Sequence, residues 1–304
     1  MSYSEAQVLE VLARIFASNS ADIQVGIGDD AAVVKVHPGE LVMTTDMAVE
    51  GVHFKRSWSS ANDIGHRIIA ANLADLIAMG ATPAHLVAAV SLTGDEPLEW
   101  IEELAIGMRD EAAKVGAVIV GGDLVRSDLI TLAITAIGYT QHPILRSGAK
   151  VGDSIYISGL PGFSAAGHAA LILGKSEREF ARAISAFRAP DVAYEIGKQM
   201  WRANSLTDIS DGVTTQAEQM ADASGVKFAF ELEGFRASSD FALLESLAKE
   251  CGISIWQWIL AGGEDHGFLA TGKDLPGLRV GSVIAGNGVE VIGLAELPKK
   301  FEHF

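Results

Sequence analysis

Short apolar runs rich in β-branched residues alternate along the chain with segments whose apolar side chains recur at helical spacing. The first pattern is typical of strands and the second of amphipathic helices. Their alternation predicts an α/β (α+β) fold. We expect helices over residues 4–17, 62–80, 98–115, 213–224 and 239–260, and strands over residues 85–92, 117–120, 130–138, 154–158 and 226–232.

The most informative stretch is residues 41–54. An apolar run with strand character ends there in two hydroxyls and a carboxylate, Thr44, Thr45 and Asp46. Ligands of open α/β sheets bind beyond the carboxyl ends of strands, so we expect these side chains at a strand end and in contact with a ligand. Alternatively, Thr-Thr-Asp caps a following helix, but residues 47–54 contain a glycine and lack helical periodicity.

A second candidate is a carboxylate inside an apolar helix. Residues 70–79 are apolar almost all round except for Asn72 and Asp75, which share one face. Such a helix is buried, and a buried carboxylate is costly unless it is paired, hydrogen-bonded or bound to a metal. No lysine or arginine stands one helical turn from Asp75. We therefore favour a metal over a local ion pair as its partner.

Carboxylates recur beside glycine or serine at other predicted strand ends. Asp30 lies in the glycine-rich turn at residues 26–31, Asp123 follows a pair of glycines, and Asp208 and Asp211 flank a serine. The turn at residues 26–31 also fits the loose dinucleotide pattern GxGxxA, but its adjacent carboxylates would repel a pyrophosphate. Taken alone, this turn is equally well explained as a solvated Asp-Asp turn.

Composition narrows the classes of protein. With 304 residues, 49% of them hydrophobic, the chain can bury a large core, and we expect two domains, residues 1–140 and 150–304. The net charge of −16 disfavours nucleic acid as a partner. No apolar run is long enough for a membrane span, so we expect no membrane association and a cytosolic, cytoplasmic protein. The single cysteine, Cys251, excludes an intrachain disulfide and a cysteine-based zinc cluster.

The acidic residues together predict metal-dependent chemistry. Convergent carboxylates cannot all stay ionised without cations, and Mg²⁺, which prefers oxygen ligands and phosphates, suits them best. The sequence lacks a GxSxG elbow, and the glycines at positions 162 and 167 are not followed by the Lys-Ser/Thr of a P-loop. We therefore expect phosphoryl transfer from a nucleotide by positioning and charge neutralisation, without a covalent intermediate.

These motifs, in this order and over nearly the whole chain, resemble those of the thiamine-monophosphate kinases. They comprise residues 26–32, 44–46, 49–54, 71–75, 79–83, 121–123, 208–212 and 262–265. The resemblance implies the two-domain fold of aminoimidazole ribonucleotide synthetase, with an N-terminal ATP- and Mg²⁺-binding domain that forms a homodimer through its sheet. It also implies direct transfer of the ATP γ-phosphoryl group to thiamine monophosphate, giving thiamine diphosphate.

The resemblance assigns roles to individual residues. It implies that Mg²⁺ is bound by Asp30, Thr44, Thr45, Asp46, Asp75, Asp123, Asp208 and Asp211, with Asp46, Asp75 and Asp211 as the catalytic residues. Gly122, Asp123, Arg146 and Ser210 would contact ATP, and His53, Glu264 and Phe301 the thiamine phosphate. The aromatic residue that stacks on adenine in the family aligns with Leu104, so Trp100, one turn earlier, is considered as a substitute.

The chain departs from the family pattern in two places. Residues 266–268 read His-Gly-Phe where the family usually has Tyr-Glu-Leu, and residues 213–215 read Val-Thr-Thr where it has Leu-Ala. Within the same fold, selenophosphate synthetase and a hydrogenase maturation protein use essential cysteines near their termini, and Cys251 is in neither place. A catalytically inactive nucleotide or Mg²⁺ sensor is a further alternative, although all the proposed metal carboxylates are present.

Overall fold

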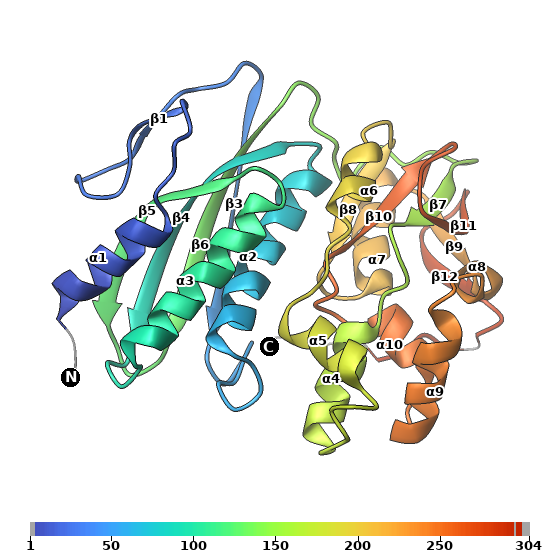
Figure 1. Ribbon diagram of the computed structural model, residues 1–304. Coiled ribbons are helices and arrows are strands. Elements are labelled where there is room, and N and C mark those ends of the chain that lie inside the picture. The colour runs from blue at the N-terminus through green and yellow to red at the C-terminus, as the bar shows by residue number, and fades with distance from the viewer. Residues whose placement is uncertain (1–3, 295, 300–304) are drawn as a thin grey trace. The chain divides into compact units, whose positions relative to one another are not determined.

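The computed structural model describes residues 4–294 and 296–299, which form two compact units (Figure 1). The first unit comprises Met1–Leu76 and Ala81–His142, and the second comprises Ile77–Gly80 and Pro143–Phe304. Each unit has its own sheet and its own helices, and each is described by itself below.

The first unit is built on a four-stranded sheet with the strand order β3-β6-β4-β5. Its strands are β3 (Glu40–Val49), β4 (Thr82–Leu92), β5 (Val118–Arg126) and β6 (Thr131–Thr140), and its helices are α1 (Glu5–Ile15), α2 (Ala61–Ala78) and α3 (Leu98–Ala113). β6 is antiparallel to β3 and β4, whereas β4 and β5 are parallel. A short hairpin of β1 (Ile23–Val25) and β2 (Val33–Val34) carries the Asp-Asp turn between its strands.

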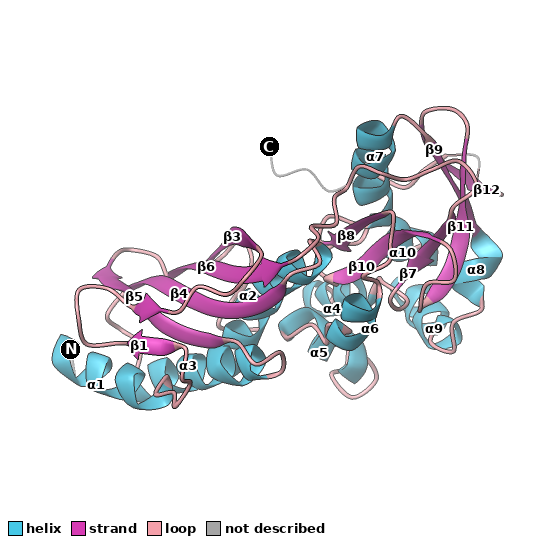
Figure 2. Cartoon of the chain, turned by 90° about the horizontal axis from the view of Figure 1, so that it is seen from above, coloured by secondary structure: helices cyan, strands magenta, loops and turns pink. Residues whose placement is uncertain are grey.

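Helices cover one face of this sheet, and no helix of the unit covers the other (Figure 2). Alternate residues of β6, including Leu132, Ile134 and Ala136, are fully buried because they face the helices. α2 and α3 approach each other closely, since a Cβ atom on Gly107 would lie 2.1 Å from the main-chain oxygen of Asn62. Glycine at position 107 therefore allows the backbones of α2 and α3 to approach each other at this crossing, where any larger residue would keep them apart.

The second unit is built on a six-stranded sheet with the strand order β12-β9-β11-β7-β10-β8. Its strands are β7 (Ser154–Ile157), β8 (Ser205–Ile209), β9 (Lys227–Glu231), β10 (Gly267–Gly272), β11 (Leu278–Ile284) and β12 (Gly288–Ile292). Its helices are α4 (Phe163–Ile172), α5 (Ala181–Arg188), α6 (Tyr194–Gln199), α7 (Val213–Ser224), α8 (Leu232–Arg236), α9 (Phe241–Cys251) and α10 (Ile255–Ala261). A core cluster that includes Phe228, Phe230 and Trp258 contains residues of both the sheet and the helices.

Two strands of the first unit continue well beyond their predicted ends. Thr44, Thr45 and Asp46 lie inside β3, hydrogen-bonded in register with β6. β5 likewise passes through Asp123 to Arg126. The expectation that these polar groups stand at strand ends is therefore wrong. β3 and β5 are the two edge strands of the sheet, where polar side chains are tolerated within a strand.

Across the ranges that the structure describes, no helix in either unit has the length and apolar character needed to cross a membrane.

Candidate active site

A carboxylate and a hydroxyl meet on the helix-covered side of the first sheet. The Oγ1 atom of Thr44, on β3, donates a 2.6 Å hydrogen bond to Oδ2 of Asp75, on α2. Asp75 is partly buried, and Asn72, one turn earlier, is fully buried, with an Oδ1 atom that finds no hydrogen-bond partner among the described residues. The contact that links Asp75 to β3 is thus the hydroxyl of a residue 31 positions earlier in the chain, which the sequence could not name.

Strand alternation separates the polar residues of β3 onto two faces. Thr44 and Asp46 are two positions apart and point to the same side, whereas Thr45 points to the open side of the sheet. The Thr45 hydroxyl donates to the Ile134 carbonyl at 2.9 Å and accepts from the Thr135 hydroxyl at 3.3 Å. Its side chain is therefore turned away from Asp46, and as a metal ligand Thr45 could offer only its main-chain oxygen.

Asp123 lies at the opposite edge of the same sheet. Two strands separate β3 from β5, and strand spacings of about 4.8 Å then put roughly 14 Å between their backbones. At that spacing, Asp46 and Asp123 of one chain are too far apart to share a Mg²⁺ ion, whose ligands lie about 2 Å away. In keeping with this, no three His, Cys, Asp or Glu side chains of the described residues are placed to hold one ion. The acidic residues therefore fit several ions completed by phosphate or water oxygens, not one preformed cluster.

An apolar cavity of about 90 Å³ lies beside Asp123. Gly122 and Asp123 of β5 line it together with Leu104 and Met108 of α3 and residues of α1 and β4. Glycine is required at position 122, because a Cβ atom there would lie 2.0 Å from the main-chain oxygen of Ala88. The cavity thus brings together three residues that the sequence connected with ATP, namely Leu104, Gly122 and Asp123.

Of the described residues, Leu104 lines this cavity and Trp100 does not. Trp100 packs against the cluster of Val8, Leu92 and Ile101, of which Leu92 and Ile101 also line the cavity. Of the two candidates for contact with adenine, the geometry therefore favours Leu104.

His53 and Asp30 lie in turns of the first unit. The Nδ1 atom of His53 accepts a 3.1 Å hydrogen bond from the main-chain N–H of Val49. In the neutral ring the proton is therefore on Nε2. Asp30 is exposed in the turn between β1 and β2. His53 is thus prepared to donate to an anionic group such as a phosphate.

In the second unit, the acidic motif after β8 pairs with the segment that precedes β10. The main-chain N–H of Glu264 donates to the Ser210 carbonyl at 2.7 Å, and that of His266 donates to the Ile209 carbonyl at 3.0 Å. Glu264 and His266 have φ angles of 66° and 50°, which are uncommon for residues other than glycine. The Ser210 hydroxyl accepts a 2.9 Å hydrogen bond from Gln216 of α7. The backbone is therefore held in an unusual conformation next to the predicted ligands Asp208 and Asp211.

A buried histidine, His266, lies between two of the predicted site carboxylates. Its Nδ1 atom is 3.3 Å from Oδ2 of Asp208, and its Nε2 atom is 3.6 Å from Oε2 of Glu264. Burial alone would lower the pKa of His266, but the carboxylates of Asp208 and Glu264 raise it to about 10. The imidazolium thus partly neutralises both acids. Sequence reasoning noted the unusual residue at position 266 but did not foresee this contact.

Arg146 lies beside the first residues of β8. Its Nε atom donates a 3.2 Å hydrogen bond to the hydroxyl of Thr207, the neighbour of Asp208, and the side chain is exposed. A guanidinium fixed in this way is well suited to bind a phosphate. Phe301, which the sequence analysis connected with the thiamine ring, lies outside the described residues.

Known proteins can be aligned with most of this chain. The family model described as AIR synthase related protein, N-terminal domain, matches residues 28–140. A thiamine-monophosphate kinase of Mycobacterium tuberculosis is 36% identical over 252 residues, which are 82% of this chain and 75% of the relative. This chain belongs to the thiamine-monophosphate kinase family. The family's member from Aquifex aeolicus is 33% identical over 287 residues, covering 91% of this chain and 92% of the relative.

Solved structures of the family have the same fold. The structure of AaThiL complexed with AMPPCP and TMP has a TM-score of 0.81 at 30% identity, and covers 99% of this chain and 97% of that one. Thiamine-monophosphate kinase from Stenotrophomonas maltophilia K279a has a TM-score of 0.81 at 27% identity, with coverage of 97% and 98%. The expected α/β fold of the aminoimidazole ribonucleotide synthetase-like superfamily is thereby confirmed. The hydrogenase maturation protein HypE, at 18% identity and a TM-score of 0.73, shares the fold alone.

Proposed function

We propose that this protein transfers the γ-phosphoryl group of ATP to thiamine monophosphate, with Mg²⁺, to give thiamine diphosphate and ADP. A phosphate oxygen of thiamine monophosphate attacks the γ-phosphorus, and the bond from that phosphorus to the β–γ bridging oxygen breaks as ADP leaves. The observation that carries the proposal is the likeness, over nearly the whole chain, to a family member complexed with AMPPCP and TMP.

The apolar cavity beside Asp123 is our candidate for contact with adenine. Its volume of about 90 Å³ is below that of most ligand pockets. It therefore suits one edge of a base and not a whole nucleotide. Leu104 and Met108 offer apolar contact to the ring, and Gly122 lets the ligand approach the strand backbone. Asp123 also borders this cavity, but it pairs with Ala89 and alternates with Leu124, so its side chain points to the other face of the sheet, and a metal ion that it holds for the nucleotide would lie on that face.

The side chains of Thr44, Asp46 and Asp75 would hold Mg²⁺ in the first unit, because they point to one side of β3 and two of them are already joined by a hydrogen bond. When bound there, Mg²⁺ would neutralise the phosphate oxygens on which negative charge resides. Asp30 would add a ligand from its exposed turn, and Asp123 would serve a separate ion at the far edge of the sheet. Thr45 would contribute at most its main-chain oxygen.

The second unit would supply further phosphate and substrate contacts. Arg146 would bind phosphate oxygens through its guanidinium, and Ser210 would contact ATP. Asp208 and Asp211 would hold Mg²⁺, and Glu264 would contact the thiamine part. In the first unit, His53 would donate from Nε2 to the phosphate of thiamine monophosphate.

A homodimer formed through the open face of the first sheet also belongs to this proposal. Leu41, Met43 and Met47 of β3 lie on that face and are 52%, 60% and 57% exposed. In register beside Met43 lies Ile137 of β6, which widens the apolar strip. Exposed apolar patches of this kind mark interaction surfaces. We expect light scattering to give twice the monomer mass, and Met43→Glu to shift the protein towards the monomer.

The test of the reaction is ADP release coupled to the appearance of thiamine diphosphate, with purified protein, ATP, Mg²⁺ and thiamine monophosphate. One thiamine diphosphate should form for each ADP released, and neither should form with EDTA or without thiamine monophosphate. ADP release that does not depend on thiamine monophosphate would contradict the proposal and would indicate another ATP-dependent activity. The expected cytoplasmic location stays a prediction.

A further inference from the structure

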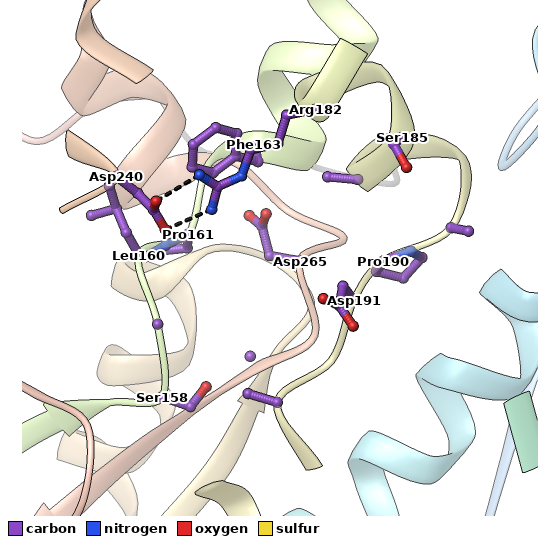
Figure 3. Close-up of a pocket in the computed structure, with 15 residues that line it drawn as sticks. Ser158, Leu160, Pro161, Phe163, Arg182, Ser185, Pro190, Asp191, Asp240 and Asp265 are labelled. Carbon is purple, nitrogen blue, oxygen red and sulfur yellow. Dashed lines mark hydrogen bonds and ion pairs between the residues drawn. The ribbon is translucent and has the colours of Figure 1, made fainter. Parts of the chain in front are cut away.

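The second unit contains a cavity that none of the roles above uses. Its volume is about 390 Å³. Its wall is formed by the residues that follow β7, by the first residue of α4, by residues of α5 and by Asp265. Figure 3 shows the Asp265 carboxylate pointing into the space between Phe163 on one side and Asp191 and Pro190 on the other. We call it the Asp265 cavity. Its size is within the usual range for a small-molecule pocket.

Asp265 is anchored in an orientation that leaves it facing this cavity. Its Oδ2 atom accepts a 2.7 Å hydrogen bond from the main-chain N–H of Gly162, and its Oδ1 atom accepts one of 3.1 Å from Ser164. Each carboxylate oxygen has a second lone pair, so both retain the capacity for one more hydrogen bond. The two existing bonds come from the start of α4, which fixes the plane of the carboxylate.

Among the described residues that line the cavity, none is a cation paired with Asp265, although the charge of the neighbouring His266 acts on it from outside the lining. The guanidinium of Arg182, which does line the cavity, makes two 2.6 Å hydrogen bonds to Asp240 and lies 4.2 Å from the centre of the Phe163 ring. Burial raises the pKa of Asp265 to about 6, against the smaller opposing effect of the two main-chain bonds. Near neutral pH the ionised Asp265 carboxylate can therefore accept hydrogen bonds through both oxygens, and the protonated form can donate through one oxygen and accept through the other.

Most of the other lining residues are apolar or small. Leu160, Pro161, Phe163 and Pro190 provide ring and aliphatic surface. Besides Asp265 and the Asp240 that Arg182 holds, Asp191 adds an exposed carboxylate. A planar ring could pack against this surface while its edge meets Asp265. Apolar walls with a few placed polar groups are the usual construction of a pocket for an aromatic ligand.

We propose that the Asp265 cavity binds an amino-substituted six-membered heteroaromatic ring, and that this ring is the aminopyrimidine of thiamine monophosphate. In an aminopyrimidine the amino N–H and the adjacent ring nitrogen lie side by side. The amino group donates to one oxygen of Asp265, and the other oxygen shares a proton with the ring nitrogen, forming a bidentate pair. The inference rests on the proposed function for the identity of the substrate.

Adenine carries the same amino and ring-nitrogen edge, so the same cavity chemistry could recognise either molecule. We favour the thiamine substrate because the first unit offers adenine its own apolar cavity at Leu104 and Gly122. Asp191 at the edge of the Asp265 cavity also favours a cationic ligand, and the thiazolium ring of thiamine is cationic.

The decisive experiment compares thiamine monophosphate with oxythiamine monophosphate, in which an oxo group replaces the amino group. Wild-type protein should prefer thiamine monophosphate by at least about tenfold in kcat/KM, since the oxo oxygen would face the carboxylate. Asp265→Asn should reduce this preference to nearly one, because an amide can donate to the oxo group. Asp222 is an exposed carboxylate on α7, so Asp222→Asn should keep the wild-type ratio of kcat/KM for thiamine monophosphate to kcat/KM for oxythiamine monophosphate. A preference that survives in Asp265→Asn would overturn the assignment.

A second variant tests the same cavity in case Asp265→Asn does not fold. Ser185 lines the cavity from the exposed side of α5, so Ser185→Trp should fill it without disturbing the core. We expect KM for thiamine monophosphate to rise about tenfold or more and KM for ATP to stay the same, with Ala223→Trp on α7 as the matched control. A rise in KM for ATP alone would identify adenine as the occupant, and unchanged constants would leave the cavity without a role in either substrate. Failure of the proposed function would appear differently, as wild-type protein that forms no thiamine diphosphate.

Discussion

Replacing Asp75 with asparagine separates its proposed catalytic role from its structural one. Asp75 accepts the 2.6 Å hydrogen bond from Thr44 and is only partly buried. Asparagine has nearly the same shape, and its amide oxygen can accept the same hydrogen bond. Because a hydrogen bond of this kind contributes about 1 kcal/mol net, we expect Asp75→Asn to change the free energy of unfolding by no more than that.

The effect on turnover should be much larger than the effect on folding. Asparagine removes the negative charge that would hold Mg²⁺, and losing one such electrostatic contact in a transition state costs about 3–4 kcal/mol. At about 1.4 kcal/mol for each factor of ten, kcat/KM should fall by roughly 100- to 1,000-fold. Thr44→Val should show the reverse pattern, because it keeps the carboxylate but removes its hydrogen-bond donor. We expect it to lose about 1–2 kcal/mol of stability and to retain more activity than Asp75→Asn.

The measurement is coupled ADP release over a wide range of Mg²⁺ concentrations, together with thermal unfolding in the presence and absence of Mg²⁺ and AMPPCP. Asp110→Asn serves as the matched control, since Asp110 is an exposed carboxylate on α3 that pairs with the exposed Arg109. Ligands that bind the folded state raise the melting temperature, so wild type and Asp110→Asn should be stabilised by the ligands more than Asp75→Asn is.

Two results would refute this reasoning. Wild-type kcat/KM in Asp75→Asn would show that the Asp75 charge is not used in the reaction. An equal loss of stability and activity in Asp75→Asn and Thr44→Val would show that the pair only supports the contact between α2 and β3.

Four further predictions concern other parts of the chain. Leu104→Ala should raise KM for ATP several-fold while Trp100→Ala leaves it unchanged, as steady-state kinetics with varied ATP will show. Gly107→Ala should destabilise the protein by about 1–3 kcal/mol in urea unfolding, although the same change in an open helix stabilises, because its Cβ would lie 2.1 Å from a main-chain oxygen. Since burial raises the pKa of Asp265 to about 6, the folded state holds that proton more tightly than the unfolded state. Wild-type stability should therefore fall relative to Asp265→Asn, by up to about 3 kcal/mol between about pH 4 and about pH 7 in parallel denaturation curves. Phe301→Ala should raise KM for thiamine monophosphate about tenfold without changing KM for ATP, which initial rates at varied thiamine monophosphate will test.

The sequence predicted the elements of this fold more reliably than their ends. The helix over residues 213–224 agrees residue for residue with α7, because glycines flank it on both sides and mark its limits. β3 and β5 were predicted to stop where polar residues begin, and both continue through those residues. Periodicity shows which side chains are apolar, but it does not show that a strand lies at the edge of a sheet, where polar residues can continue it.

The sequence also identified chemically important residues more successfully than their contacts. Asp75 was singled out because a carboxylate in an apolar helix needs a partner, and it has one in Thr44. That partner is 31 residues earlier in the chain, on another element, so no local rule could have named it. The same limit explains why Thr44, Thr45 and Asp46 were grouped as ligands. Only the strand geometry shows that Thr45 faces away from the other two.

The pairing between the end of β8 and the segment before β10 shows where sequence reasoning stops. His266 and Asp208 are 58 positions apart, and they meet because β10 lies beside β8 with Gly267 opposite Ile209. The main-chain bonds to Ile209 and Ser210 then require positive φ angles at His266 and Glu264, a conformation that glycine would adopt at lower cost. Retaining charged side chains at both positions costs stability. That cost is understandable if Glu264 contacts the substrate and His266 fixes the position of Glu264 relative to Asp208.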